Sequence, residues 1–200
     1  MTGDGLSVAA RASILARMSK RAVGVGVGIL GIAALLLGLQ SKQWVVGTDY
    51  GTEMHVGLRV MDQCQVVQPE ADEPGEEVCS TLSHADFAQS GANDDGFDTF
   101  SLASHLTFYA GLITVGALLV VILLALLGRF PTTPIAPPTL AIMLSVATLL
   151  LIVAVVSIHP WREIGWGTGH SIFMAGGGAT ACLAAAILLG RLRPPVQDLW

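Results

Sequence analysis

Four long apolar segments, none with an Asp, Glu, Lys or Arg, constrain this chain more than any other feature. They cover residues 22–39, 106–127, 140–158 and 172–189, and each contains 18 to 22 residues. A helix needs about 20 apolar residues to cross a hydrocarbon core of roughly 30 Å. Backbone groups in lipid must find hydrogen-bond partners within the protein, which favours helices of this length over strands. We therefore predict an all-α membrane protein, a bundle of four transmembrane helices.

The overall composition agrees with this prediction. Hydrophobic residues make up 52% of the chain and charged residues 12%, and the mean hydropathy is +0.66. Soluble domains carry about 25% charged residues. The first apolar segment follows a long basic stretch, and Gly38-Leu39-Gln40 is a poor match to a signal-peptidase site. We interpret it as a retained signal anchor.

The distribution of Lys and Arg predicts the orientation. Seven basic residues flank the span ends on the side of the two termini, and three lie on the other side, Lys42, Arg59 and Arg162. Positive residues favour the cytoplasm. We therefore expect a multi-pass plasma-membrane protein in which residues 1–21, the link 128–139 and the tail 190–200 are cytoplasmic, and residues 40–105 and 159–171 are outside. Within residues 1–21, apolar positions interspersed with Arg and Lys predict an amphipathic helix on the cytoplasmic leaflet.

The large outer loop, residues 40–105, is strongly acidic. It holds twelve acidic residues against two basic ones. Such charge keeps a loop soluble and away from anionic headgroups. The alternative is a surface that attracts cations, and both interpretations stay open.

The same loop carries strand-like segments. Residues 43–47 and 55–60 are rich in β-formers and flank a turn, which predicts a hairpin. Residues 63–67 and 78–82 flank a stretch of Pro, Glu, Asp and Gly, which predicts a second hairpin. This places Cys64 and Cys79 on facing strands, and an oxidising compartment favours a disulfide between them. We expect a small disulfide-stapled β-sheet here, whereas Cys182 lies within a predicted span as a packing residue.

This layout resembles the superfamily of claudins, peripheral myelin proteins and calcium-channel gamma subunits. The matching residues are Trp44 after the first span, Gly57-Leu58, and the cysteines Cys64 and Cys79. Arg59 stands where the Gly-Leu-Trp motif of these families has Trp, and the spacings around Cys64 are long. The resemblance implies cytoplasmic termini and a non-enzymatic function, either as an accessory subunit of a membrane complex or as an adhesion or barrier component.

Small residues line one side of the first and fourth spans. They are Gly24, Gly28, Gly31 and Gly38 in the first span, and Ala175, Gly178, Ala179, Cys182 and Ala186 in the fourth. Small residues allow helix backbones to approach closely in lipid. We expect contacts within the bundle, with an intermolecular interface as the alternative.

Sequence motifs for catalysis are not found in this chain. It has no nucleotide-binding glycine loop, nucleophile elbow or His-Glu-x-x-His, and no carboxylate lies inside a predicted span. We expect neither an enzyme nor a nucleic-acid partner. The second hypothesis is a redox protein that binds haem, copper or zinc through histidines at the outer ends of the spans, because imidazole is a common ligand of these groups. The candidates at the span ends are His105, His159 and His170, of which two could bind a haem, or a copper or zinc ion together with Asp86 or His84.

Apolar residues near the outer interface are candidates for partner contacts. They are Trp44, Leu58, Phe97, Phe100, Trp161 and Trp166. Aromatic residues at this level either form a belt in the membrane interface or dock another protein. We expect a contact surface formed by the sheet and the turn 161–169, with other membrane-protein subunits or further copies of the chain as partners.

Overall fold

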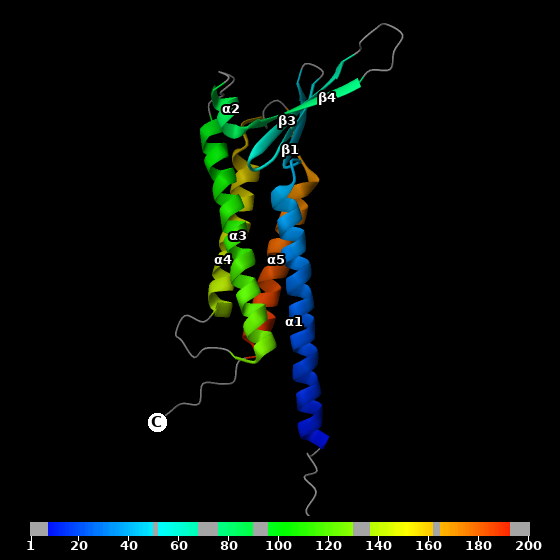
Figure 1. The fold of residues 1–200 in the computed structure, drawn as a ribbon. Coiled ribbons are helices and arrows are strands. Elements are labelled where there is room, and N and C mark those ends of the chain that lie inside the picture. Colours follow the sequence, from blue (N-terminus) through cyan, green and yellow to red (C-terminus); the bar gives the residue numbers. More distant parts are fainter. Residues whose placement is uncertain are drawn as a thin grey trace, which may run out of the picture.

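Four long helices and one five-stranded sheet form the protein, seen in a computed structural model that describes residues 8–49, 52–67, 76–89, 96–129, 137–161 and 165–192. The helices run side by side and the sheet lies across one end of the bundle (Figure 1). The long helices are α1 (Val8–Gln40), α3 (Phe97–Leu127), α4 (Pro137–Ile158) and α5 (His170–Gly190). A short helix, α2 (His84–Gln89), lies next to the start of α3.

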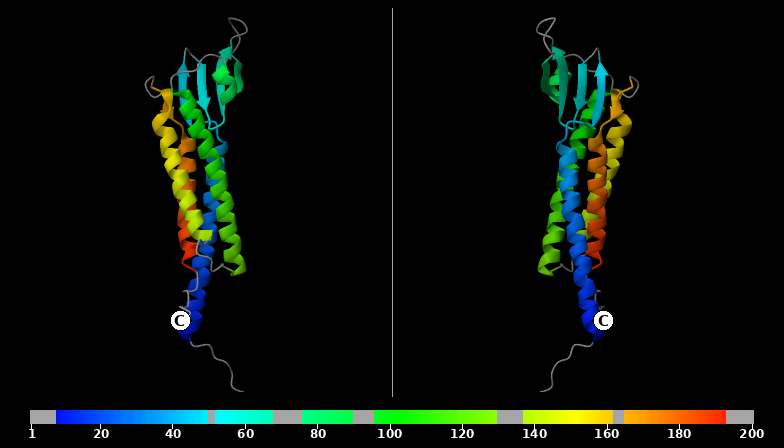
Figure 2. Two further views of the ribbon diagram at one scale, coloured as in Figure 1. Left: turned by 90° about the vertical axis from the view of Figure 1, so that its left-hand side faces the viewer. Right: turned by 90° about the vertical axis from the view of Figure 1, so that its right-hand side faces the viewer.

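The four helices are long and apolar enough to cross a membrane, as predicted. The qualifying stretches are Met18–Gln40, Phe97–Leu127, Pro137–Ile158 and His170–Gly190. Each stretch contains one predicted span in full and is longer than it. The largest difference is in α3, which begins at Phe97, nine residues before the predicted span, and therefore extends into the sheet layer. α1 is one continuous helix from Val8, so residues 8–21 prolong the first span and do not form a separate element (Figure 2). Residues 1–7 lie outside the described residues, as do most of the predicted link and tail.

Local sequence explains where two of these helices begin and end. α3 ends at Gly128, whose φ of 69° is in the left-handed region and whose N–H returns to the last turn. Glycine adopts this conformation without steric cost. α4 begins with Pro137, and proline is favoured in the first turn because its missing N–H would have no helical partner.

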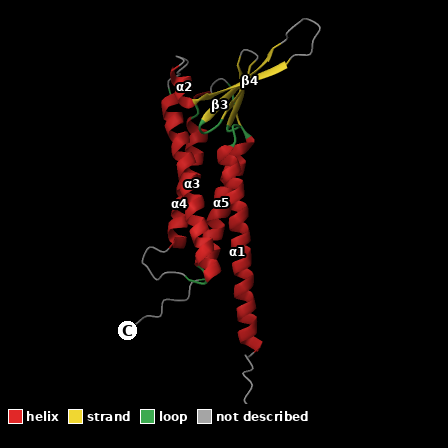
Figure 3. Cartoon of the chain, in the orientation of Figure 1, coloured by secondary structure: helices red, strands yellow, loops and turns green. Residues whose placement is uncertain are grey.

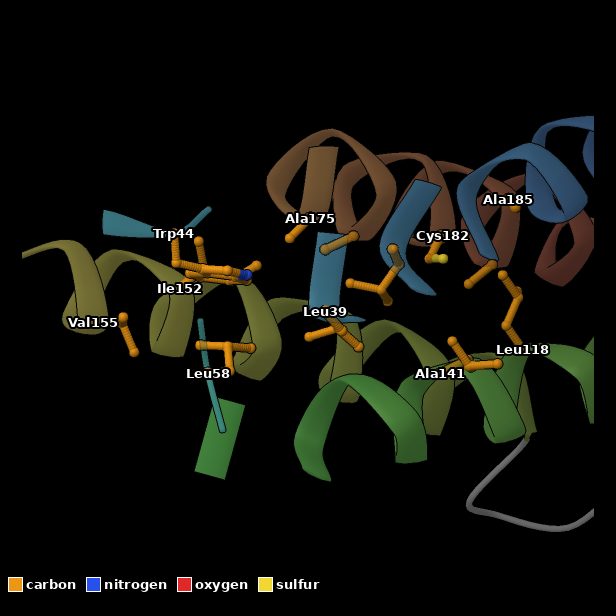
Figure 4. Close-up of a cluster of buried hydrophobic side chains, with 14 of the residues drawn as sticks. Leu39, Trp44, Leu58, Leu118, Ala141, Ile152, Val155, Ala175, Cys182 and Ala185 are labelled. Carbon is orange, nitrogen blue, oxygen red and sulfur yellow. The ribbon is translucent and has the colours of Figure 1, made fainter. Parts of the chain in front are cut away.

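Glycines allow the backbones of α1 and α5 to approach each other closely. A Cβ added at Gly38 would contact the backbone of Ala175, and one at Gly178 would contact the backbone of Leu35. Figure 4 shows Ala175 and Cys182 on the side of α5 next to α1. Gly24 and Gly31 also face α5, whereas Gly28 lies against both α5 and α3. These glycines therefore lie where the helices of one chain approach each other closely.

The sheet is antiparallel with strand order β4-β3-β2-β1-β5, and its strands are drawn in yellow at one end of the bundle in Figure 3. The strands are β1 (Val45–Asp49), β2 (Thr52–Val56), β3 (Val60–Val67), β4 (Glu76–Ser83) and β5 (Gly167–Thr168). Cys64 pairs with Cys79 across β3 and β4, and the two form a disulfide. The second predicted hairpin and its disulfide are thus confirmed.

Two parts of the sheet differ from the sequence-based expectation. The segment 55–60, predicted as one strand, is divided between β2 and β3 by a turn at residues 57–59, in which the Gly57 N–H bonds to the carbonyl of Val60 at 2.8 Å. The outer turn 161–169 supplies β5, which pairs with β1. A β-rich composition does not reveal a tight turn inside a run, and a two-residue strand has no recognisable pattern.

The two faces of the sheet differ because strand residues alternate. Val45, Val56 and Met61 lie on one face and are fully buried in the same core as the helix ends. His55, Asp62 and Thr81 lie on the opposite face, at paired positions of three neighbouring strands. We call this second surface the polar face. The sheet is therefore fixed to the bundle by one face and leaves the other accessible.

Candidate functional site

An ion pair and hydrogen bonds organise the centre of the polar face. Lys42, just after α1, places its Nζ 2.8 Å from Oδ2 of Asp62. Thr81 of β4 donates its hydroxyl to Oδ1 of the same carboxylate at 2.5 Å. Partial burial raises the pKa of Asp62, but hydrogen bonds from Lys42 and Thr81 and the charge of Lys42 outweigh it and hold the pKa below its ordinary value of 3.8. Asp62 is therefore an anion at neutral pH.

A polar groove adjoins this network. Its volume is about 380 Å³, and it is lined by Ser41, Lys42, Gln43, His55, Asp62, Cys64 and His170. His55 lies 3.6 Å from a carboxylate oxygen of Glu53, measured from Nε2. No group among the described residues hydrogen-bonds to Nδ1 of His55. The groove thus offers charges of both signs to a polar ligand or protein surface.

Most of these groove residues were missed by sequence reasoning. Lys42, His55 and Asp62 belong to different segments and carry no joint motif. The alternation along β3 was the available signal, because buried Met61 and the polar Asp62 must point to opposite faces. It identifies a polar face, but only the strand register shows that Asp62 lies between His55 and Thr81.

The six predicted partner-contact residues are buried, so the prediction that they form an exposed surface is wrong. Each has at most 7% of its surface exposed: Trp44, Leu58, Phe97, Phe100, Trp161 and Trp166. Trp161 stacks on Trp166 with ring centroids 5.2 Å apart and meets Phe100 edge-on at 5.3 Å. The indole N–H of Trp44 donates to the carbonyl of Gly38 at 2.7 Å. These side chains join the sheet to the helix ends, because burying large apolar side chains there stabilises the fold more than exposing them to water would. Figure 4 shows Trp44 and Leu58 within this core.

The four candidate metal-binding histidines do not form one cluster. The rings of His84 and His105 lie 5.6 Å apart, His159 is buried, and His170 lines the polar groove. His84 donates Nε2–H to the carbonyl of Gly57 at 3.1 Å, and His105 donates Nδ1–H to that of Ser101 at 2.7 Å. In the described part of the chain, no three His, Cys, Asp or Glu side chains are placed to hold a metal ion. The hypothesis of a haem or metal centre gains no support from this arrangement.

Burial controls the protonation of His84. Its removal from water, followed by the nearby His105, lowers the pKa of His84 from 6.5 to about 4, although the hydrogen bond to Gly57 opposes this shift. His84 is therefore neutral near pH 7. Its ring contacts Phe97 and Phe100, so it acts as part of the aromatic core that carries the sheet.

No protein-family model matches this chain, and no curated protein matches it.

Proposed function

We propose that this integral membrane protein acts without catalysis and binds other proteins through the polar face of its sheet. Its function is that of an accessory subunit of a membrane complex or of an adhesion or barrier component, as in the superfamily that it resembles. The excess of basic residues at the other end of the bundle supports an arrangement with the sheet outside the plasma membrane and both termini in the cytoplasm.

The observation that carries this proposal is the construction of the sheet. Its apolar face is buried on the helix ends, and a disulfide joins β3 to β4. The Lys42, Asp62 and Thr81 network on the opposite face is already formed. A surface that is ordered before binding loses less conformational entropy when a partner docks. This favours recognition by the polar face over recognition by a loop that must first become ordered.

The residues of the polar face also indicate what kind of partner surface it would bind. It presents a paired Lys and Asp, two histidines and an exposed Glu53, whose side chain is 64% exposed. Such surfaces match polar, hydrated protein interfaces, in which charged pairs fix the register and direct hydrogen bonds are supplemented by water. The partner surface is accordingly polar and carries charges of both signs.

Site-specific photo-crosslinking in the native membrane tests the proposal. A photoreactive amino acid at Glu53 lies on the polar face, and one at Ser80 lies on the opposite face of the sheet at an exposed position. We expect discrete crosslinked products from position 53 and not from position 80. A product of twice the chain mass indicates self-assembly, and other masses indicate a complex with other subunits. Equal crosslinking at both positions, or none at position 53, would refute the polar face as the binding surface.

A further inference from the structure

Arg59 occupies an unusual position at the boundary between the sheet and the helices. It belongs to the turn between β2 and β3, and its Cζ lies 5.1 Å from the centroid of the Phe108 ring on α3. The side chain is exposed. None of the carboxylates in the described ranges forms an ion pair with it, whereas Lys42 is paired with Asp62. Arg59 is thus a cation held on an aromatic ring with its hydrogen-bond donors still available.

A cleft of about 390 Å³ opens beside Arg59. Its apolar walls are Leu39 at the end of α1, Phe108 on α3, and Leu58 and Val60 around the turn. Leu39 and Leu58 are almost completely buried, so these walls are fixed parts of the core. The cleft therefore combines one accessible guanidinium with a preformed apolar surface.

The depth of the cleft corresponds to the edge of the hydrocarbon layer. The first membrane-crossing stretch ends at Gln40, one residue after Leu39. Phe108 is the third residue of the apolar segment 106–127, and Leu112, one turn further on the same side, is 38% exposed. An apolar path thus continues from the cleft onto the outer surface of α3, which faces lipid if the helices span a membrane.

We propose that this cleft binds a glycerophospholipid. The phosphodiester lies against the guanidinium of Arg59, and the first part of an acyl chain lies on the partly exposed Val60 and Phe108 before it continues along α3. A guanidinium presents several N–H donors in a plane and binds phosphate oxygens through two of them at once. The cation–π contact with Phe108 holds the guanidinium at the level where lipid phosphates meet the helices. An unpaired cation beside an apolar cleft matches the two parts of this lipid better than it matches a peptide.

Native mass spectrometry of the whole protein in a neutral detergent tests the proposal. The probe is dioleoylphosphatidylglycerol, titrated until one bound lipid is resolved. A hydrogen-bonded contact to a charged group contributes about 1.5 kcal/mol at the lower end of its range, so Arg59→Gln should weaken the affinity about tenfold. Arg129→Gln is the matched control, because Arg129 is an exposed arginine after the other end of α3.

Two further ligands test the phosphate-binding and the chain-binding parts of the site separately. Dioleoylglycerol has the chains without the phosphate, and glycerol 3-phosphate has the phosphate without the chains; we expect both to bind much more weakly than the phospholipid. Arg59→Lys keeps the charge but loses the planar fork, so it should show a smaller loss, and it replaces Arg59→Gln if that variant cannot be purified. Wild-type affinity in the Arg59 variants, an equal loss in Arg129→Gln, or equally tight binding of dioleoylglycerol would overturn the proposal.

Discussion

Adjacent glycines in α5 provide a sharp test of how the bundle packs. A Cβ added at Gly178 would contact the backbone of α1, including the Leu35 Cα at 2.7 Å and the Ala34 carbonyl carbon at 2.9 Å. A Cβ added at Gly177 would meet nothing within 4 Å. Gly178→Ala and Gly177→Ala are therefore the same chemical change at neighbouring positions, one inside the α1–α5 contact and one outside it.

The difference between the two variants isolates the packing cost. Replacing a helical glycine by alanine contributes about 1 kcal/mol through helix propensity at either position, so this gain cancels. The atoms that a Cβ at Gly178 would contact are backbone atoms, so relief requires a shift of a whole helix. Overpacking of this kind costs about 1–3 kcal/mol. Separation of the helices would also weaken the close contact between Gly38 and Ala175. We expect Gly178→Ala to be less stable than Gly177→Ala by about 1–3 kcal/mol.

Unfolding in mild detergent with increasing amounts of a denaturing detergent measures this difference. Helical circular dichroism gives the midpoint, and size-exclusion chromatography shows whether each variant has the oligomeric state of the wild type. Equal stability of the two variants would refute the packing of α1 on this face of α5. A loss confined to Gly177→Ala, with dissociation of an oligomer, would favour the intermolecular interface that the sequence left open.

Three further predictions concern the sheet and its attachment. Replacing both Cys64 and Cys79 by Ser removes a crosslink between residues 15 apart, which should cost the sheet roughly 3 kcal/mol; limited proteolysis should cut the sheet faster while helical circular dichroism stays unchanged. The folded state lowers the pKa of His84 from 6.5 to about 4, so the free energy of unfolding should be at its full value above pH 6.5 and should fall by at most about 3 kcal/mol as the pH drops towards 4, because the unfolded chain then binds the proton more readily. His84→Gln should flatten this part of the profile of stability against pH. Trp44→Phe leaves the Gly38 carbonyl without its indole donor, and a loss of about 1–3 kcal/mol should appear as a lower thermal midpoint.

The membrane-crossing helices were predictable because their signal is local. An uncharged run of about 20 residues fixes a span regardless of its neighbours. The Cys64–Cys79 pair was also accessible, because two β-rich segments around one turn bring their cysteines into register. Both inferences need only residues that lie close together in the sequence.

The sequence did not reveal how the loop folds onto the helix ends. Phe97 and Trp161 are aromatic residues near the predicted interface in either case, and composition cannot distinguish a belt or an anchor from a core residue. Their burial follows from β5, which brings the turn 161–169 onto β1, and from the extension of α3 beyond its predicted start. Such long-range contacts leave no periodic pattern in the sequence. The grouping of His55, Asp62 and Thr81 on the polar face was missed for the same reason, because alternation along one strand separates its two faces but does not show which strands are neighbours.

The proposed function depends on the membrane topology, because recognition by the polar face requires the sheet to lie outside the cell. Cys64 and Cys79 are joined and Cys182 is buried, so a membrane-impermeant maleimide reports only on an added cysteine. Glu53→Cys is on the sheet, and Arg129→Cys is at the opposite end of the bundle. We predict that the maleimide labels Glu53→Cys at once in intact cells and labels Arg129→Cys only after permeabilisation. Labelling of Arg129→Cys in intact cells, with Glu53→Cys protected until permeabilisation, would contradict it.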